Sequence, residues 1–169
     1  VSQNLHAELL VRRLSFAAPA PEPGRTPPVD SLDRGLAAAR NVLESAGLPR
    51  AGFDFADGSG MSTYNRISPR AAVMLLRWTA TQPWGATYRA SLPVGGVDGT
   101  LRRRFAETPL AGKIFAKTGT LNATNALSGW LIAASGRELT FAILANDVPE
   151  GASALAVMDR ALLAIAAQN

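Results

Sequence analysis

Three apolar segments of strand length follow one another between residues 113 and 146, and they constrain the fold more than any other part of the sequence. The segments are Lys113–Thr120, Ala126–Ala134 and Leu139–Asn146, and Ser135-Gly136-Arg137 is a compact hairpin turn between the last two. Consecutive strands joined by short turns pair antiparallel. The sequence therefore predicts an antiparallel meander in the second half of the chain.

Helical segments flank this meander. Apolar residues recur at helical spacing over 5–14 and 31–46, with Gly47 placed to cap the second segment. Ser68-Pro69 has an N-cap serine and a proline at the first helical position, which predicts a helix to about Thr81, and an apolar helix over 151–167 closes the chain. Less regular structure is predicted elsewhere: a proline-rich loop over 18–28, a short strand at most over 53–55, a turn-rich loop over 57–62, an irregular segment over 83–99 and a short helix over 100–105.

The predicted fold class is α+β, within a single domain of 169 residues. We expect an antiparallel sheet with the N-terminal and C-terminal helices on one face, and the helices that begin at Ser31 and Ser68 elsewhere around it. No internal repeat is visible in the sequence.

Composition excludes several classes of site. The chain has no cysteine and one histidine, His6, so we expect no disulfide and no zinc site. No cofactor is expected. The net charge is +4, but the basic run Arg102–Arg104 has no interleaved aromatic residues, and we interpret it as a solvated helix face rather than a nucleic-acid site. A basic nucleic-acid binder is the weakest alternative, and no nucleic-acid partner is expected.

The strongest local feature is Lys117-Thr118-Gly119-Thr120, at the end of an alternating strand. Thr118 and Thr120 are expected on one face, since side chains alternate along a strand. With the cation of Lys117 and a glycine that lets a ligand approach the backbone, the segment could bind a carboxylate. On its own it is more typical of a strand that ends in a glycine turn.

Ser2-Gln3-Asn4 precedes the first predicted helix, and alone it indicates a helix cap, because serine and asparagine are favoured there. Together with Lys117-Thr118-Gly119 it resembles two of the three elements around the cleft of serine β-lactam-recognising enzymes, Ser-x-Asn and Lys-Thr-Gly, in the right order. Further blocks are similar to the class C low-molecular-mass penicillin-binding proteins. These blocks are Ser2–Leu10, Asp57–Ser62 with Asn65-Arg66, Leu92–Leu101 and Ala116–Leu121.

This resemblance implies a β-lactamase/transpeptidase-like fold and a serine-type D-alanyl-D-alanine carboxypeptidase or endopeptidase. It implies a catalytic role for Ser2 as a proton relay, for Asn4 in positioning the substrate amide, and for Lys117 in raising the positive potential of the cleft. The substrate-binding residues that it implies are Thr118, Gly119, Thr120 and Leu121, with Ser59, Met61 and Ser62 near the pocket wall. Thr63 stands where many relatives carry arginine, which leaves the side-chain preference open.

One departure concerns the nucleophile. The family's Ser-x-x-Lys element is absent, because the residues three before Lys113 and Lys117 are Leu110 and Ile114. We therefore expect residues 1–169 to be the C-terminal part of a catalytic domain, with the acylation serine on an N-terminal segment of the same protein that acts as a partner. This chain alone is expected to be inactive.

The resemblance also implies partners and a location. Peptidoglycan peptides are the expected substrate, β-lactam antibiotics the expected covalent inhibitors of the intact enzyme, and the periplasm or cell envelope the expected site. Two alternatives stay open: a β-lactamase or esterase of the same superfamily, and a non-catalytic cell-wall binding module.

Overall fold

The computed structural model describes residues 2–16 and 30–169, which form two units, Ser2–Ala71 and Ala72–Asn169. The loop predicted over 18–28 lies outside the described residues. Within the described stretches, no helix combines the length and the apolar character that a membrane span requires.

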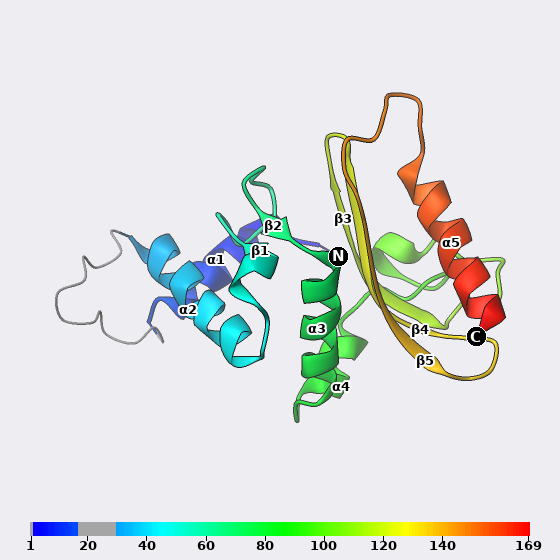
Figure 1. Ribbon diagram of the computed structural model, residues 1–169, viewed down its shortest axis with the longest axis horizontal. Helices are drawn as coiled ribbons and strands as arrows, with labels where there is room; N and C mark the ends of the chain where they lie inside the picture. Colours follow the sequence, from blue (N-terminus) through cyan, green and yellow to red (C-terminus); the bar gives the residue numbers. More distant parts are fainter. Residues whose placement is uncertain (1, 17–29) are drawn as a thin grey trace. The chain divides into compact units, whose positions relative to one another are not determined.

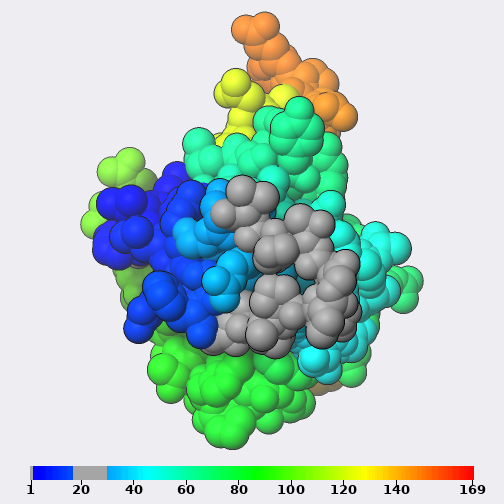
Figure 2. Space-filling model, turned by 90° about the vertical axis from the view of Figure 1, so that its left-hand side faces the viewer, coloured from blue at the N-terminus to red at the C-terminus, as the bar shows by residue number. Residues whose placement is uncertain are grey.

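Helices α1 (Asn4–Leu14) and α2 (Ser31–Ser45) pack against each other in the first unit. A Cβ atom at Gly35 would lie 1.9 Å from the carbonyl oxygen of Val11, so only glycine fits where α2 meets α1. Helix α1 has no fully buried residue and lies at the surface, drawn in dark blue in Figure 2. Both predicted helices are confirmed. Helix α1 belongs to the first unit, where it packs on α2, and the large sheet belongs to the second. The expectation that the N-terminal helix lies on a face of the sheet stays a prediction.

Each end of α2 is capped. The carboxylate of Asp30 accepts hydrogen bonds from two backbone amides of the first turn. At the other end, Gly47 has a φ of +85°, and the amide of Leu48 donates to the carbonyl of Leu43 at 3.0 Å. This is the Schellman arrangement, in which glycine is favoured because the left-handed region is open to it. The predicted cap at Gly47 is confirmed.

A two-stranded sheet completes the first unit. The short 3-10 helix η1 (Arg50–Gly52) leads into β1 (Phe53–Asp54), which pairs antiparallel with β2 (Arg66–Ile67). The sequence predicts the short strand at 53–55 but not its partner. Helix α3 (Pro69–Ala80) follows, and the Ser68 hydroxyl accepts the amide of Ala71 at 3.1 Å, which confirms the predicted helix start.

The second unit is built on the predicted meander. Strands β3 (Ile114–Leu121), β4 (Thr124–Ile132) and β5 (Glu138–Ala145) form an antiparallel sheet in the order β3-β4-β5. The turn between β4 and β5 contains Gly136 at a φ of +86°, as a tight hairpin requires. All three predicted strands are confirmed. Within the described residues β5 forms the outer edge of the sheet, without a further strand.

Helix α5 (Ala154–Gln168) covers one face of this sheet (Figure 1). Its apolar stripe, Met158, Leu162 and Ala166, packs into a cluster of fully or nearly fully buried side chains from the strands and the preceding loop. The strand and loop members are Leu101, Phe105, Leu110, Ile114, Ala116, Leu127, Leu131, Ala133 and Phe141. The predicted C-terminal helix is confirmed but begins later, after its cap Ser153, whose hydroxyl accepts the amide of Ala156.

The opposite face carries an aromatic cluster. Trp130 is 2% exposed and packs with Leu76, Tyr88 and Leu92. Tyr88 belongs to a six-residue helix, α4 (Gly85–Ala90), which lies inside the segment predicted to be irregular. The helix predicted over 100–105 is shorter, a 3-10 turn η2 (Gly99–Leu101). Helix α4 was missed because a six-residue helix shows too little periodicity to be recognised in the sequence, and its formation depends on how it packs.

Candidate active site

The Lys117–Leu121 segment forms the second half of β3. It pairs with β4 in the register Lys117 with Ser128, Thr118 with Leu127, and Thr120 with Asn125. The preceding residues Ile114 and Ala116 are fully buried and anchor the strand in the core. Since alternate residues share a face, Thr118 and Thr120 lie on one face of the sheet, as predicted.

Lys117 provides a cation, and none of the ion pairs formed by the described residues includes it. Its side chain is exposed, and its ammonium group donates a hydrogen bond to the carbonyl oxygen of Thr118. Among the described residues, no acidic side chain lies within ion-pair distance of it. Partial desolvation lowers the pKa of Lys117. An anion would therefore find an exposed positive charge at this end of the strand.

Gly119 is not required by the packing of the protein. A Cβ atom built there would meet only the Cβ of Ala126, at an ordinary contact distance of 3.5 Å. Gly129, on the neighbouring strand, differs, because its Cβ would lie 2.0 Å from the carbonyl oxygen of Phe115. The open space beside Gly119 leaves its backbone accessible to a ligand.

Ser2 and Asn4 are exposed where α1 begins. The N-cap of α1 is Gln3, with a φ of −128° and no side-chain capping bond, and Asn4 is the first helical residue. The helix-cap interpretation of this segment is therefore wrong. Within residues 2–16 and 30–169 neither side chain makes a hydrogen bond, so both polar groups are available to other molecules.

The Asp57–Ser62 loop is folded around one carboxylate. Asp57 accepts hydrogen bonds from the amides of Gly60 at 2.7 Å and Ser62 at 2.5 Å, and from Nδ2 of Asn65 at 2.8 Å. Burial alone would raise the pKa of Asp57, but these hydrogen bonds outweigh it and the pKa is lowered. The loop presents Met61 at 55% exposure.

Glu8 ties this loop to α1. The amide of Ser59 donates to Oε1 of Glu8 at 3.0 Å, and Nη1 of Arg12 donates to Oε2 at 2.9 Å. The hydrogen bond from the Ser59 side chain is the main reason why the pKa of Glu8 is lowered. Gly58 lies so close to α1 that a Cβ atom would stand 2.6 Å from the carbonyl oxygen of Ala7. Glu8 was missed in the sequence, because its role depends on a contact with Ser59, which is 51 positions further along the chain.

The predicted residues thus fall into two groups. Ser2 and Asn4 share the first unit with the loop residues, and Glu8 joins α1 to that loop. The Lys117–Leu121 group lies in the second unit.

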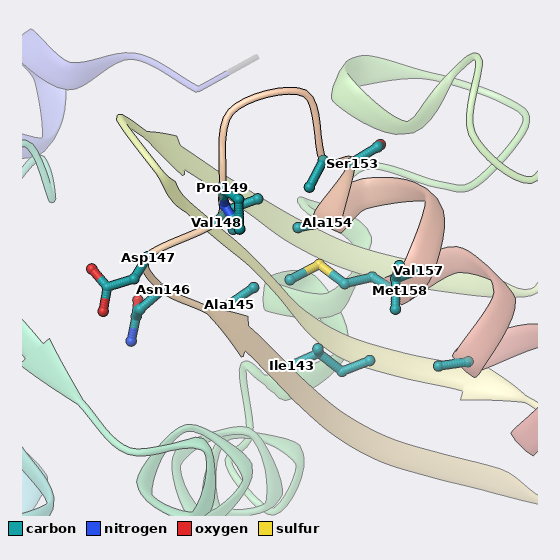
Figure 3. Close-up of a pocket in the computed structure, with 12 residues that line it drawn as sticks. Ile143, Ala145, Asn146, Asp147, Val148, Pro149, Ser153, Ala154, Val157 and Met158 are labelled. Atoms are coloured by element: carbon teal, nitrogen blue, oxygen red, sulfur yellow. The ribbon is translucent and has the colours of Figure 1, made fainter.

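The second unit also contains an apolar cavity of about 330 Å³ between the end of β5 and the start of α5 (Figure 3). Ile143, Ala145, Val157 and Met158 are among its lining residues, and none of the predicted site residues is. Among the described residues, no cluster of histidine, cysteine and acidic side chains is arranged to hold a metal ion.

Comparison with known sequences identifies relatives along nearly the whole chain. The D-Ala-D-Ala carboxypeptidase 3 (S13) family matches residues 1–168. The chain is 37% identical to a D-alanyl-D-alanine carboxypeptidase of Actinomadura sp. (strain R39), over 94% of this chain and 28% of that protein. It is 34% identical to the carboxypeptidase DacB of Mycolicibacterium smegmatis, over 91% of this chain and 33% of that protein. The chain thus spans about a third of the length of these curated relatives.

A solved structure has the same fold. Penicillin-binding protein 4 (dacB) from Haemophilus influenzae, crystallised with a β-lactam, superposes with a TM-score of 0.78 at 27% identity. The superposition covers 94% of this chain and 36% of that protein. The α+β class, with an antiparallel sheet flanked by helices, is therefore confirmed.

Proposed function

Because this chain belongs to the D-Ala-D-Ala carboxypeptidase 3 (S13) family, we propose that it contributes part of the catalytic centre of a serine-type DD-peptidase. The enzyme cleaves the D-Ala-D-Ala bond or the cross-links of peptidoglycan peptides through an acyl-enzyme. The observation that carries this proposal is the exposed Lys117, which pairs with no carboxylate of residues 2–16 and 30–169, beside Thr118 and Thr120 at the end of β3.

In this proposal the Lys117–Leu121 group binds the anionic end of the substrate. Lys117 supplies the positive charge, and the hydroxyls of Thr118 and Thr120 donate to the terminal carboxylate. The backbone amide of Thr120 forms half of the oxyanion hole, and loss of such a donor typically costs about 10²–10³ in turnover. Gly119 and Leu121 line the path of the bound peptide.

Ser2 and Asn4 act on the peptide bond itself. Ser2 relays a proton to the leaving amine, and Asn4 hydrogen-bonds the amide of the acyl side and orients it. Both side chains are exposed and neither caps helix α1, which supports these roles. Ser59, Met61 and Ser62 contribute to the wall of the substrate pocket, and Glu8 holds that loop against the helix that carries Asn4.

The nucleophilic serine and its lysine lie on a segment of the same protein outside residues 1–169. Two facts support this: neither lysine of the chain has a serine three residues before it, and the chain spans about a third of its relatives. Residues 1–169 then form the C-terminal part of a transpeptidase-like domain, with that segment as their partner. The substrate, peptidoglycan, places the enzyme outside the cytoplasm, and β-lactams acylate it.

Fluorescent penicillin tests this proposal. The full-length protein is incubated with the reagent, separated on a denaturing gel and mapped by peptide mass analysis, while D-alanine release from a D-Ala-D-Ala peptide is measured in parallel. Label outside residues 1–169 together with D-alanine release supports the peptidase.

Other outcomes point elsewhere. Label on Ser59 or Ser62 refutes an external nucleophile. Rapid turnover of the penicillin without D-alanine release indicates a β-lactamase. Neither label nor release indicates a binding module.

A further inference from the structure

A hydroxyl that no sequence motif assigns lies against the Lys117–Thr120 segment. Oγ1 of Thr100 and Oγ1 of Thr118 are 2.9 Å apart and hydrogen-bonded, although the residues are 18 positions apart in sequence. Thr100 belongs to η2 and is exposed. It is the one described side chain that hydrogen-bonds a hydroxyl of the proposed carboxylate-binding group.

The loop that carries Thr100 is fastened to the edge of β3. The amide of Gly95 donates to the carbonyl of Ile114 at 2.9 Å, and the amide of Ala116 donates to the carbonyl of Pro93 at 3.0 Å. A Cβ atom at Gly95 would lie 2.3 Å from the side chain of Ile114, so the loop lies as close to the strand as glycine allows. The backbone before Thr100 is therefore an extension of the sheet beyond β3.

The residues on either side of Thr100 are also anchored. Oδ1 of Asp98 accepts the amide of Val94 at 2.8 Å and so ties the loop together. Leu101 is fully buried in the core, and Arg104 donates from Nε and Nη2 to the carboxylate of Asp159 on α5. Arg104 thus fixes this segment. Thr100 is held in place by contacts that do not depend on any ligand.

The hydrogen bond between the two hydroxyls can control where the proton of Thr118 points. Each threonine hydroxyl has one proton and two acceptor sites. In the structure the Thr118 hydroxyl donates to Oγ1 of Thr100. Both hydroxyls can rotate, so when an anion binds, Thr118 can turn its single proton to the anion while Thr100 donates to Oγ1 of Thr118. A hydroxyl that already accepts a hydrogen bond is also a stronger donor.

We propose that Thr100 is a positioning residue that orients the hydroxyl proton of Thr118 toward the carboxylate of the substrate or of a β-lactam. The inference rests on the proposed function, since it assigns a partner to a residue of that same site. It predicts that Thr100 contributes to the recognition of a negative charge and not to the chemistry of acylation itself.

The test uses the full-length protein and two acylating reagents, a penicillin with its free carboxylate and the same penicillin as its methyl ester. Thr100→Val removes the hydroxyl with little change in shape. Thr100→Ser keeps the hydroxyl, and Thr87→Val, at an exposed position of α4, is the matched control. The second-order rate constant of acylation is measured for each pair.

We expect Thr100→Val to lower the rate constant with the free penicillin by about 5- to 10-fold, the usual effect of one hydrogen bond, and to leave the ester rate unchanged. Thr100→Ser should restore the wild-type ratio of the two rates, and Thr87→Val should not alter it. In a Thr118→Val background, Thr100→Val should add no further loss, because the two residues act as one unit.

Three results would overturn the assignment. They are an unchanged free-penicillin rate in Thr100→Val, an equal loss with both reagents, and a failure of Thr100→Ser to restore the ratio. If the wild-type protein itself reacts with neither reagent, the proposed function is refuted and the role of Thr100 with it. That outcome is distinct from the other three, in which the wild-type protein reacts.

Discussion

Replacement of Gly58 by alanine should loosen the helix that carries Asn4. The new Cβ would stand 2.6 Å from the carbonyl oxygen of Ala7 and 2.6 Å from Cγ2 of Val11. The valine methyl can rotate away, but the helical carbonyl cannot move unless α1 or the loop moves. Overpacking of this kind costs about 1–3 kcal/mol. The shift also stretches the hydrogen bond from the Ser59 amide to Glu8.

Hydrogen exchange measured by mass spectrometry detects this change in individual segments, whereas a measurement of global unfolding averages over the whole protein. In the full-length Gly58→Ala variant, peptides covering 4–14 and 57–62 should exchange about 5- to 150-fold faster, the factor that corresponds to about 1–3 kcal/mol of local opening. Exchange in β3, β4 and β5 should stay at the wild-type rate. Acylation by penicillin should slow in parallel if the loop and α1 serve the site together.

Gly60→Ala is the matched control in the same loop. Gly60 has a φ of +82°, but no atom lies within 4 Å of the position that a Cβ atom would take there. Alanine at this position therefore strains the loop by about 1–2 kcal/mol without pressing on α1. Exchange should rise in 57–62 and not in 4–14. Unchanged exchange of α1 in Gly58→Ala, or equal loss of protection in α1 for both variants, would refute the close-packing argument.

Further predictions concern the charges and the core. Lys117→Met should lower kcat/KM for D-alanine release by at least about tenfold, since it removes the cation, with the free penicillin affected more than its ester. Because the pKa of Lys117 is lowered, wild-type kcat/KM should begin to fall with rising pH before an ordinary lysine would deprotonate. The pKa values of Glu8 and Asp57 are also lowered, so both carboxylates stabilise the 57–62 loop at pH values above their ordinary pKa. This stabilisation is lost as the pH falls through the lowered pKa values. The hydrogen-exchange rate of the loop, corrected for the intrinsic pH dependence of exchange, should therefore rise below about pH 4. Leu162→Ala, at a fully buried position of α5, should lower the free energy of unfolding of the second unit by about 2–5 kcal/mol, measured by thermal or urea unfolding.

The elements that the sequence predicted well are those with a local physical cause. Strand β3 begins with two buried residues, Ile114 and Ala116, on either side of a half-buried one, and α2 is followed by a glycine where a left-handed cap is needed. Both elements could therefore be placed to within a residue or two. Helix α4 and strand β2 could not be found, because each is too short to show a period and depends on partners distant in sequence.

The site was predicted unevenly for the same reason. Lys117 and the two threonines could be grouped because they are neighbours on one strand. Glu8 and Thr100 could not, since each matters through a contact with a residue far along the chain, Ser59 and Thr118 respectively. The partner of α1 within its unit, α2, could not be predicted either, because an amphipathic pattern indicates that a helix packs and does not indicate what it packs against.

The aromatic cluster has a practical consequence for spectroscopy. All three tryptophans of the chain, Trp78, Trp84 and Trp130, lie in the second unit. The ring centroids of Trp78 and Trp84 are 5.7 Å apart, and the ring centroid of Tyr88 is 6.2 Å from those of Trp84 and Trp130. Within these 169 residues, fluorescence excited at the red edge of indole absorption therefore originates in one unit. A fluorescence trace therefore reports directly on the surroundings of the second unit, and the stability of α1, α2 and the Glu8-bound loop needs a probe of its own.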